Sequence, residues 1–187
     1  MRRSLKIIFL VMTVLVAVAS FFWWWYQVPE GVDQPQKLPE EKVVLYYLNE
    51  QRYALQSVER TVPEATDRSA RVKQIVQQLT KSPDESELIR LLPPELKLRS
   101  SYMNGQTIYL DFSDQLIGAA RGTSGEMMLL YSIVNSVLKN LPEKYKLVHF
   151  LIEGEMRKTI GPYGEDSGHI AIQYPLGPRW NLTAGSS

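Results

Sequence analysis

Cysteine is absent from the 187-residue sequence, and histidine occurs only twice. The lack of cysteine excludes disulfides, thiolate metal sites, cysteine nucleophiles and lipidation at an amino-terminal cysteine. No spacing typical of metal ligands is present, so the sequence predicts neither a metal nor a cofactor. The length allows one membrane segment and one domain of roughly 130–150 residues, which can bury a proper core.

An excess of positive charge is also lacking, since there are 21 basic and 20 acidic residues. Three of the basic residues (Arg2, Arg3 and Lys6) precede an apolar segment, which leaves 18 basic against 20 acidic residues in the rest of the chain. Proteins that bind nucleic acids normally carry a basic patch that contacts the phosphates. We therefore expect no nucleic-acid partner.

Residues 7–26 contain no charged side chain. A helix of this length is about 30 Å long, which is the thickness of a bilayer core. The run ends in FFWWWY (21–26), typical of an aromatic belt at a membrane interface. Because basic residues precede it, the sequence predicts a single pass through the inner (cytoplasmic) membrane, with residues 1–6 in the cytoplasm and the rest extracytoplasmic or periplasmic. A signal peptide cleaved after Ala19 is the alternative, and it predicts the same location for the domain.

The extracytoplasmic part divides by composition. Residues 27–41 hold three prolines and show no periodicity, as expected for a semi-extended linker. Residues 42–178 carry the apolar patterns of one folded domain. Residues 179–187 are predicted to form a flexible tail.

A long amphipathic helix is the clearest feature of this domain. Apolar residues recur every three or four positions over 130–141, which places them on one helical face. Thr123 and Glu126 have the spacing of a capping box at the start of the helix. Pro142 predicts that it ends near Asn140.

The remaining patterns predict a helix over 67–80, capped by Thr66 or Asp67, a short turn over 88–92, and strands over 42–48, 57–62, 98–103, 106–112, 147–152 and 169–174. Asn104-Gly105 predicts a type I′ hairpin turn, with Leu98, Tyr102 and Ile108 on the apolar face of the hairpin. The core order is helix, strand, strand, helix, strand. Because each helix has one apolar stripe, this order favours an α/β (α+β-like) two-layer sandwich, in which helices cover mainly one face of a mixed sheet.

Four blocks of the domain follow one another in a recognisable order: LLPPELKLRSSYMNGQTIYLDFS (91–113), GTSGEMMLLYSIVNSVL (122–138), VHFLIEGE (148–155) and GHIAIQYPL (168–176). Together they resemble the GerMN domain of sporulation and spore germination proteins. The resemblance implies a ring-building type of fold, an extracytoplasmic location and no enzymatic activity. It further implies a structural or assembly role in an envelope complex, with envelope proteins or further copies of the chain, in oligomers or rings, as partners. Members are tethered as lipoproteins or by a membrane segment; without a cysteine, this chain would bind the lipid bilayer through residues 7–26.

The resemblance marks four motif positions as candidate binding residues: Glu126, Asn135, Gly154 and His169. No catalytic residue is predicted, because capping and turn chemistry explain the acidic residues near the hairpin and the helix start, and because His149 lies inside a buried strand. The alternative is a peptidoglycan-acting enzyme or a ligand-binding envelope domain. A cleft that holds Glu126, Asp111 and His169 together would favour it. A small-ligand sensor with a deep apolar pocket is a third possibility.

Overall fold

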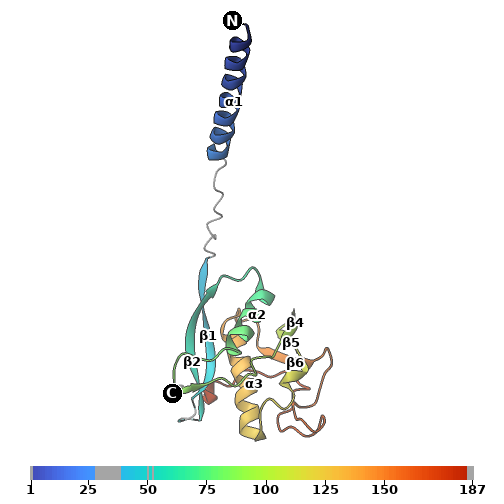
Figure 1. The fold of residues 1–187 in the computed structure, drawn as a ribbon. Coiled ribbons are helices and arrows are strands. Elements are labelled where there is room, and N and C mark those ends of the chain that lie inside the picture. The colour runs from blue at the N-terminus through green and yellow to red at the C-terminus, as the bar shows by residue number, and fades with distance from the viewer. Residues whose placement is uncertain (1, 28–38, 50, 52, 185–187) are drawn as a thin grey trace. The chain divides into compact units, whose positions relative to one another are not determined.

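The computed structural model describes residues 2–27, 39–49, 51 and 53–184, and the chain divides into two units, Met1–Lys37 and Leu38–Ser187 (Figure 1). The first unit contains one helix, α1 (Arg2–Gln27), whose described side chains from residue 10 to 26 are all exposed. Among the described residues, no helix has the length and apolar character needed to cross a bilayer. Most of the predicted linker, residues 28–38, lies outside the described residues.

The first sheet of the second unit is antiparallel. Its strands are β1 (Glu40–Asn49), β2 (Ala54–Pro63) and the two-residue β3 (Leu88–Ile89), in the order β2-β1-β3. The first two confirm the predicted strands and extend beyond them, so β1 already begins inside the predicted linker. The turn predicted over 88–92 is wrong, because residues 88 and 89 pair with the end of β1.

The second sheet is mixed. Its strands are β4 (Leu98–Asn104), β5 (Thr107–Phe112) and β6 (Leu147–Ile152); β4 and β5 are antiparallel, and β5 and β6 are parallel. The predicted single sheet is therefore two small sheets of an α+β fold. Figure 1 shows two helices, α2 (Arg68–Leu79) and α3 (Gly122–Lys139), between the β1–β2 hairpin and the sheet of β4, β5 and β6. The sequence instead predicted helices mainly on one face of one sheet.

Helices α2 (Arg68–Leu79) and α3 (Gly122–Lys139) confirm the two predicted helices. Asp67 caps α2, because its carboxylate accepts a hydrogen bond from the amide of Ala70 at 2.8 Å. Two short 3₁₀ helices complete the described elements, η1 (Asp114–Leu116) and η2 (Trp180–Leu182).

Polar side chains of α3 and of Asn140, the residue directly after it, explain why the two sheets stay separate. The hydroxyl of Ser136 accepts from the amide of Tyr46 (2.9 Å), and that of Ser132 donates to the carbonyl of the same residue (2.6 Å). The side chain of Asn140 likewise accepts from the amide of Val44 (2.8 Å) and donates to its carbonyl (2.7 Å). These groups occupy the edge of β1 that another strand would need in order to extend the sheet.

The hairpin of β4 and β5 forms as predicted, with two differences. Asn104 pairs with Thr107, so the loop is Gly105-Gln106, and of the two only Gly105 has a positive φ (57°). A type I′ turn requires positive φ at both loop residues, so that prediction is wrong. A register shift between Leu98 and Ser100 changes the side-chain alternation along β4. As a result Tyr102 is exposed and stacks on Tyr109, with ring centroids 4.6 Å apart.

The chain after β6 differs most from the predictions. Residues 169–174 form no strand, and Leu176 instead makes an isolated bridge to Val148. The predicted flexible tail contains η2, and Thr183 bridges Leu55 of β2. The described part of the tail, up to residue 184, is therefore ordered against β2, and residues 185–187 lie outside the described residues.

Candidate functional site

A cleft of about 360 Å³ lies beside the start of α3. Its lining includes Arg121 and Gly122 at the start of the helix, Glu126 one turn further on, and Tyr163 and His169 from the loop that follows β6. The helix is held in place by its apolar residues, which are almost all buried from residue 129 to 138. The cleft therefore combines one rigid wall with a wall formed by a loop.

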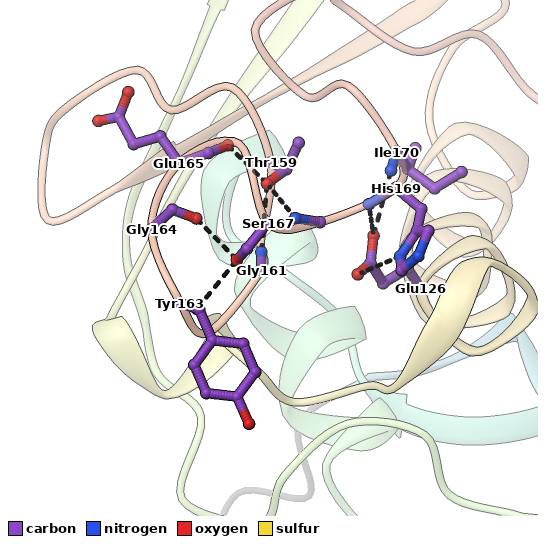
Figure 2. Close-up of polar contacts among 10 residues, drawn as sticks. Glu126, Thr159, Gly161, Tyr163, Gly164, Glu165, Ser167, His169 and Ile170 are labelled. Carbon is purple, nitrogen blue, oxygen red and sulfur yellow. Dashed lines mark hydrogen bonds and ion pairs between the residues drawn. The ribbon is translucent and has the colours of Figure 1, made fainter.

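Glu126 joins these two walls. Its side chain is 3% exposed, and one carboxylate oxygen accepts hydrogen bonds from the amides of His169 (2.6 Å) and Ile170 (3.1 Å). Figure 2 shows the carboxylate pointing at this backbone. The capping box predicted for Thr123 and Glu126 is wrong: the residue at the cap position is Arg121, which makes no side-chain capping bond, and the carboxylate binds the loop instead. The same two amides belong to the strand predicted over 169–174, which is one reason why no strand pairing forms there.

His169 lies at the edge of the cleft with its side chain 49% exposed. Its Nδ1 is 3.3 Å from the second carboxylate oxygen of Glu126. When Nδ1 carries the proton, Nε2 is left as an acceptor, so the ring can bind a donor or take a proton. Glu126 and His169 thus meet, and they are two of the three residues whose meeting would favour the enzyme alternative.

Asp111, the third member of that alternative, lies elsewhere. Its carboxylate accepts from the amide of Gly154 (2.7 Å) and is 3.5 Å from the guanidinium of Arg99, and it does not line the cleft. Gly154 occupies the turn after β6 with a φ of 83°. The two carboxylates that could share acid and base roles are therefore not in one site. No group of three or more His, Cys, Asp or Glu within the described ranges could hold a metal ion.

Asn135 is fully buried on α3 and binds the chain that leads into η2. Its side-chain oxygen accepts from the amide of Arg179 (3.0 Å), and its nitrogen donates to the carbonyl of the same residue (3.1 Å). Asn135 and Gly154 are thus absent from the cleft lining, whereas Glu126 and His169 are part of it.

His149 is buried on β6, and its ring centroid lies 5.2 Å from that of Tyr109. Burial lowers its pKa, against a smaller raising effect of a hydrogen bond with the backbone of Gln173. Its Nε2 has no hydrogen-bond partner. His149 does not line the cleft beside α3, and its structural role stays a prediction.

The loop over residues 159–168 is braced by its own side chains (Figure 2). The hydroxyl of Thr159 donates to the carbonyl of Glu165 (2.7 Å) and accepts from the amides of Gly161 (3.3 Å) and Gly168 (3.0 Å). The two glycines pack so closely that a Cβ on Gly161 would lie 2.1 Å from the amide nitrogen of Gly168. The hydroxyl of Ser167 further accepts from the amide of Tyr163 (2.9 Å).

Tyr163 stands at the outer end of this braced loop and is 92% exposed. In Figure 2 its ring points away from the other side chains of the loop. Sequence reasoning missed Tyr163 and Arg121 as site residues. The available signals were the sequence Gly161-Pro162-Tyr163-Gly164, which favours a tight loop around one aromatic residue, and a helix that starts after an arginine.

The sequence profile of the Germane family, described as sporulation and spore germination, matches residues 44–158. No curated protein matches the chain.

Several solved structures are similar in fold, including these three. The tandem GerMN domains of the sporulation protein GerM from Bacillus subtilis share 21% identity over 84% of this chain and 50% of that chain, with a TM-score of 0.57. The first of these GerMN domains alone shares 17% identity over 73% of this chain and 97% of that chain, with a TM-score of 0.53. A candidate lipoprotein from Clostridium perfringens shares 18% identity over 79% of this chain and 95% of that chain, with a TM-score of 0.51. The chain thus spans half the length of the tandem structure and nearly all of the other two structures.

Proposed function

Because the chain belongs to the Germane (GerMN) family of sporulation and spore germination domains, we propose that it is a non-enzymatic binding module, a structural or assembly component of a cell-envelope complex. The observation that carries this proposal is the braced loop over residues 159–168. It is bound to α3 through Glu126 and holds an exposed tyrosine beside a cleft. A loop backbone that is already fixed before binding loses little entropy when a partner docks, which favours a recognition role.

The contacts and burial of two carboxylates and one imidazole support the same role. The carboxylate of Glu126 binds backbone amides, that of Asp111 binds a turn, and His149 is buried. The two carboxylates therefore have structural tasks, and the imidazole of His149 is shielded from solvent. Partners in this proposal are envelope proteins or further copies of the chain, assembled into oligomers or rings.

We further propose that residues 7–26 anchor the chain in the inner membrane, with the domain on the extracytoplasmic side. Twenty consecutive uncharged residues after a basic start support this assignment, as does the aromatic end of the run. One protein of similar fold is a candidate lipoprotein, which is a different way of tethering a domain to a membrane.

Topology and cleavage can be tested on the full chain. Alkaline phosphatase fused after Ser187 should be active, the protein should stay in the membrane pellet at alkaline pH, and its intact mass should include Met1. A mass that matches a chain beginning at Ser20 would show that the segment is a cleaved signal peptide and not an anchor. An inactive fusion would exclude the extracytoplasmic location.

Assembly can be tested by placing a photo-crosslinking amino acid at residue 163 in the full chain, expressed in its own cells. We expect a defined crosslinked species that is absent when the crosslinker replaces Glu143, an exposed residue outside the cleft. Gentle detergent extraction should give a complex larger than the 21.5 kDa chain in its micelle. A monomer without crosslinks at either position would contradict an assembly role.

One observation favours the alternative of a peptidoglycan-acting enzyme, namely the contact between His169 and Glu126 at the cleft. An imidazole oriented by a carboxylate is a common general base. Purified full chain should be incubated with peptidoglycan, and soluble fragments measured by chromatography. Fragment release that is lost in His169→Ala and retained in Tyr174→Ala would establish catalysis in place of the non-enzymatic role.

A further inference from the structure

We propose that the cleft binds a carboxylate of an acidic peptide segment, with Arg121 as the cation and Tyr163 in contact with the neighbouring residues of the peptide. This proposal rests on the binding role proposed above, since it names the chemistry of the partner at the same site. The cleft, the charge of its lining and the bracing of its loop each contribute an independent reason.

The cleft lining holds one exposed cation, Arg121, and one buried carboxylate, Glu126. Arg121 is exposed at the cleft and forms no ion pair with any residue that the structure describes. The carboxylate of Glu126 also lines the cleft, but it is 3% exposed and already accepts from the amides of two loop residues. An incoming anion therefore meets the guanidinium, which is suited to bidentate binding of a carboxylate.

The local structure does not explain why an arginine stands at residue 121. It is the residue that precedes the first turn of α3, where no side chain caps the helix and no acidic residue lies in the first turn. A cation is unfavourable at this end of a helix because the helix dipole is positive there. Such a conflict between a residue and its local environment is typical of a functional position.

The backbone that carries the aromatic residue is held in place by hydrogen bonds. Tyr163 is 92% exposed, yet its backbone amide is bound by Ser167, and the loop is bound to Glu126 through the amides of His169 and Ile170. Tyrosine and arginine are the residues that most often dominate binding energy at protein interfaces. A tyrosine displayed beside an unpaired arginine fits a peptide that carries an acidic residue next to an apolar one.

The size of the cleft is compatible with the side chain of a peptide. Its volume of about 360 Å³ is near the lower end of the range for small-molecule pockets, ~300–1,000 Å³. A single acidic side chain fits such a space, while the rest of the segment lies over Tyr163 outside it. This division matches an extended segment of a protein partner.

The experiment selects phage-displayed random heptapeptides on the full chain in detergent micelles and measures the selected peptides by fluorescence anisotropy. We expect enrichment of Asp and Glu beside an apolar residue, and binding that weakens as salt is raised. Arg121→Glu should weaken binding by about tenfold or more, because a charge-assisted contact is lost and a repulsion is added. Tyr163→Ala should weaken it by about tenfold as well, and Tyr163→Phe far less.

Matched controls separate the site from general charge and surface effects. Arg68→Glu reverses an exposed cation on α2, and Tyr174→Ala removes an exposed tyrosine; neither residue lines the cleft, so both variants should bind as the wild type does. A peptide whose acidic residue is replaced by lysine should bind Arg121→Glu better than the wild type. Absence of acidic enrichment, or equal binding by Arg121→Glu and the wild type, would overturn the proposal.

Failure here can be told apart from failure of the proposed function. If photo-crosslinks and the large complex persist in Arg121→Glu and no acidic peptide is selected, the chain assembles through another surface and only the cleft proposal is wrong. If acidic peptides bind as expected but the chain is an extracted monomer without crosslinks, the assembly role is contradicted while the binding chemistry stands.

Discussion

Replacing Glu126 by alanine should release the loop after β6 from α3. The carboxylate accepts from the amides of His169 at 2.6 Å and Ile170 at 3.1 Å, and it is almost completely buried. An unsatisfied buried donor costs about 1–3 kcal/mol, and the two amides are only partly buried, so we expect the free energy of unfolding to fall by about 2–4 kcal/mol. Glu126→Gln keeps an acceptor oxygen and should cost about 1 kcal/mol.

Two measurements check this expectation. Urea unfolding of the full chain in detergent, followed by circular dichroism, gives the change in stability. Hydrogen exchange should show faster exchange of the amides of residues 169 and 170 in Glu126→Ala, while α2 is unaffected. Glu143→Ala removes an exposed carboxylate and should stay within about 0.5 kcal/mol of the wild type. Unchanged stability and unchanged exchange at both amides in Glu126→Ala would refute the role given to the carboxylate.

Three further expectations concern other parts of the domain. Asn135→Ala removes both hydrogen bonds to the backbone of Arg179 and should lower the free energy of unfolding by about 2–3 kcal/mol, with faster exchange at that amide; no change at the amide would contradict the contact. His149 has a lowered pKa in the folded chain, so the unfolded chain binds a proton at this residue more readily. The free energy of unfolding should therefore be highest above pH ~6.5 and fall as the pH drops below that value. His149→Phe should flatten this part of the urea-midpoint profile between pH 7 and 5.5, and an unaltered slope would assign it to other groups. Gly161→Ala places a Cβ 2.1 Å from the nitrogen of Gly168, so the variant should open the loop, seen as protease cleavage near Tyr163; a loop as resistant as the wild type would disprove the close packing.

Periodicity predicted the elements that bury one continuous face. The apolar spacing in α2 and α3 and the alternation in β5 follow directly from packing against a core, so their existence and approximate bounds could be predicted from the sequence. The division into two sheets could not, because it depends on Ser132, Ser136 and Asn140 binding a strand edge some 90 residues earlier in the sequence. Polar residues inside a helix carry no periodic signal of such a contact.

The candidate site was predictable only in part, for a related reason. Glu126 and His169 were marked by the resemblance as motif positions, but their contact joins residues 43 positions apart. The alternation in residues 169–174 predicted a strand, since strand patterns describe side chains and not the partners of the backbone. In this chain the carboxylate of Glu126 takes two of the amides that a neighbouring strand would have bound.

The polar residues of α3 have one task in common. Ser132, Ser136, Asn135 and Glu126 are all buried, and each binds backbone groups that no neighbouring strand binds. Buried polar side chains on a helix are unfavourable unless satisfied, so a shift of α3 would leave several donors and acceptors unpaired at once. The helix therefore fixes the position of the loop after β6 relative to β1, and also relative to the sheet of β4, β5 and β6. A partner bound at Arg121 and Tyr163 would meet a surface whose geometry is set by the core, and not by the loop alone.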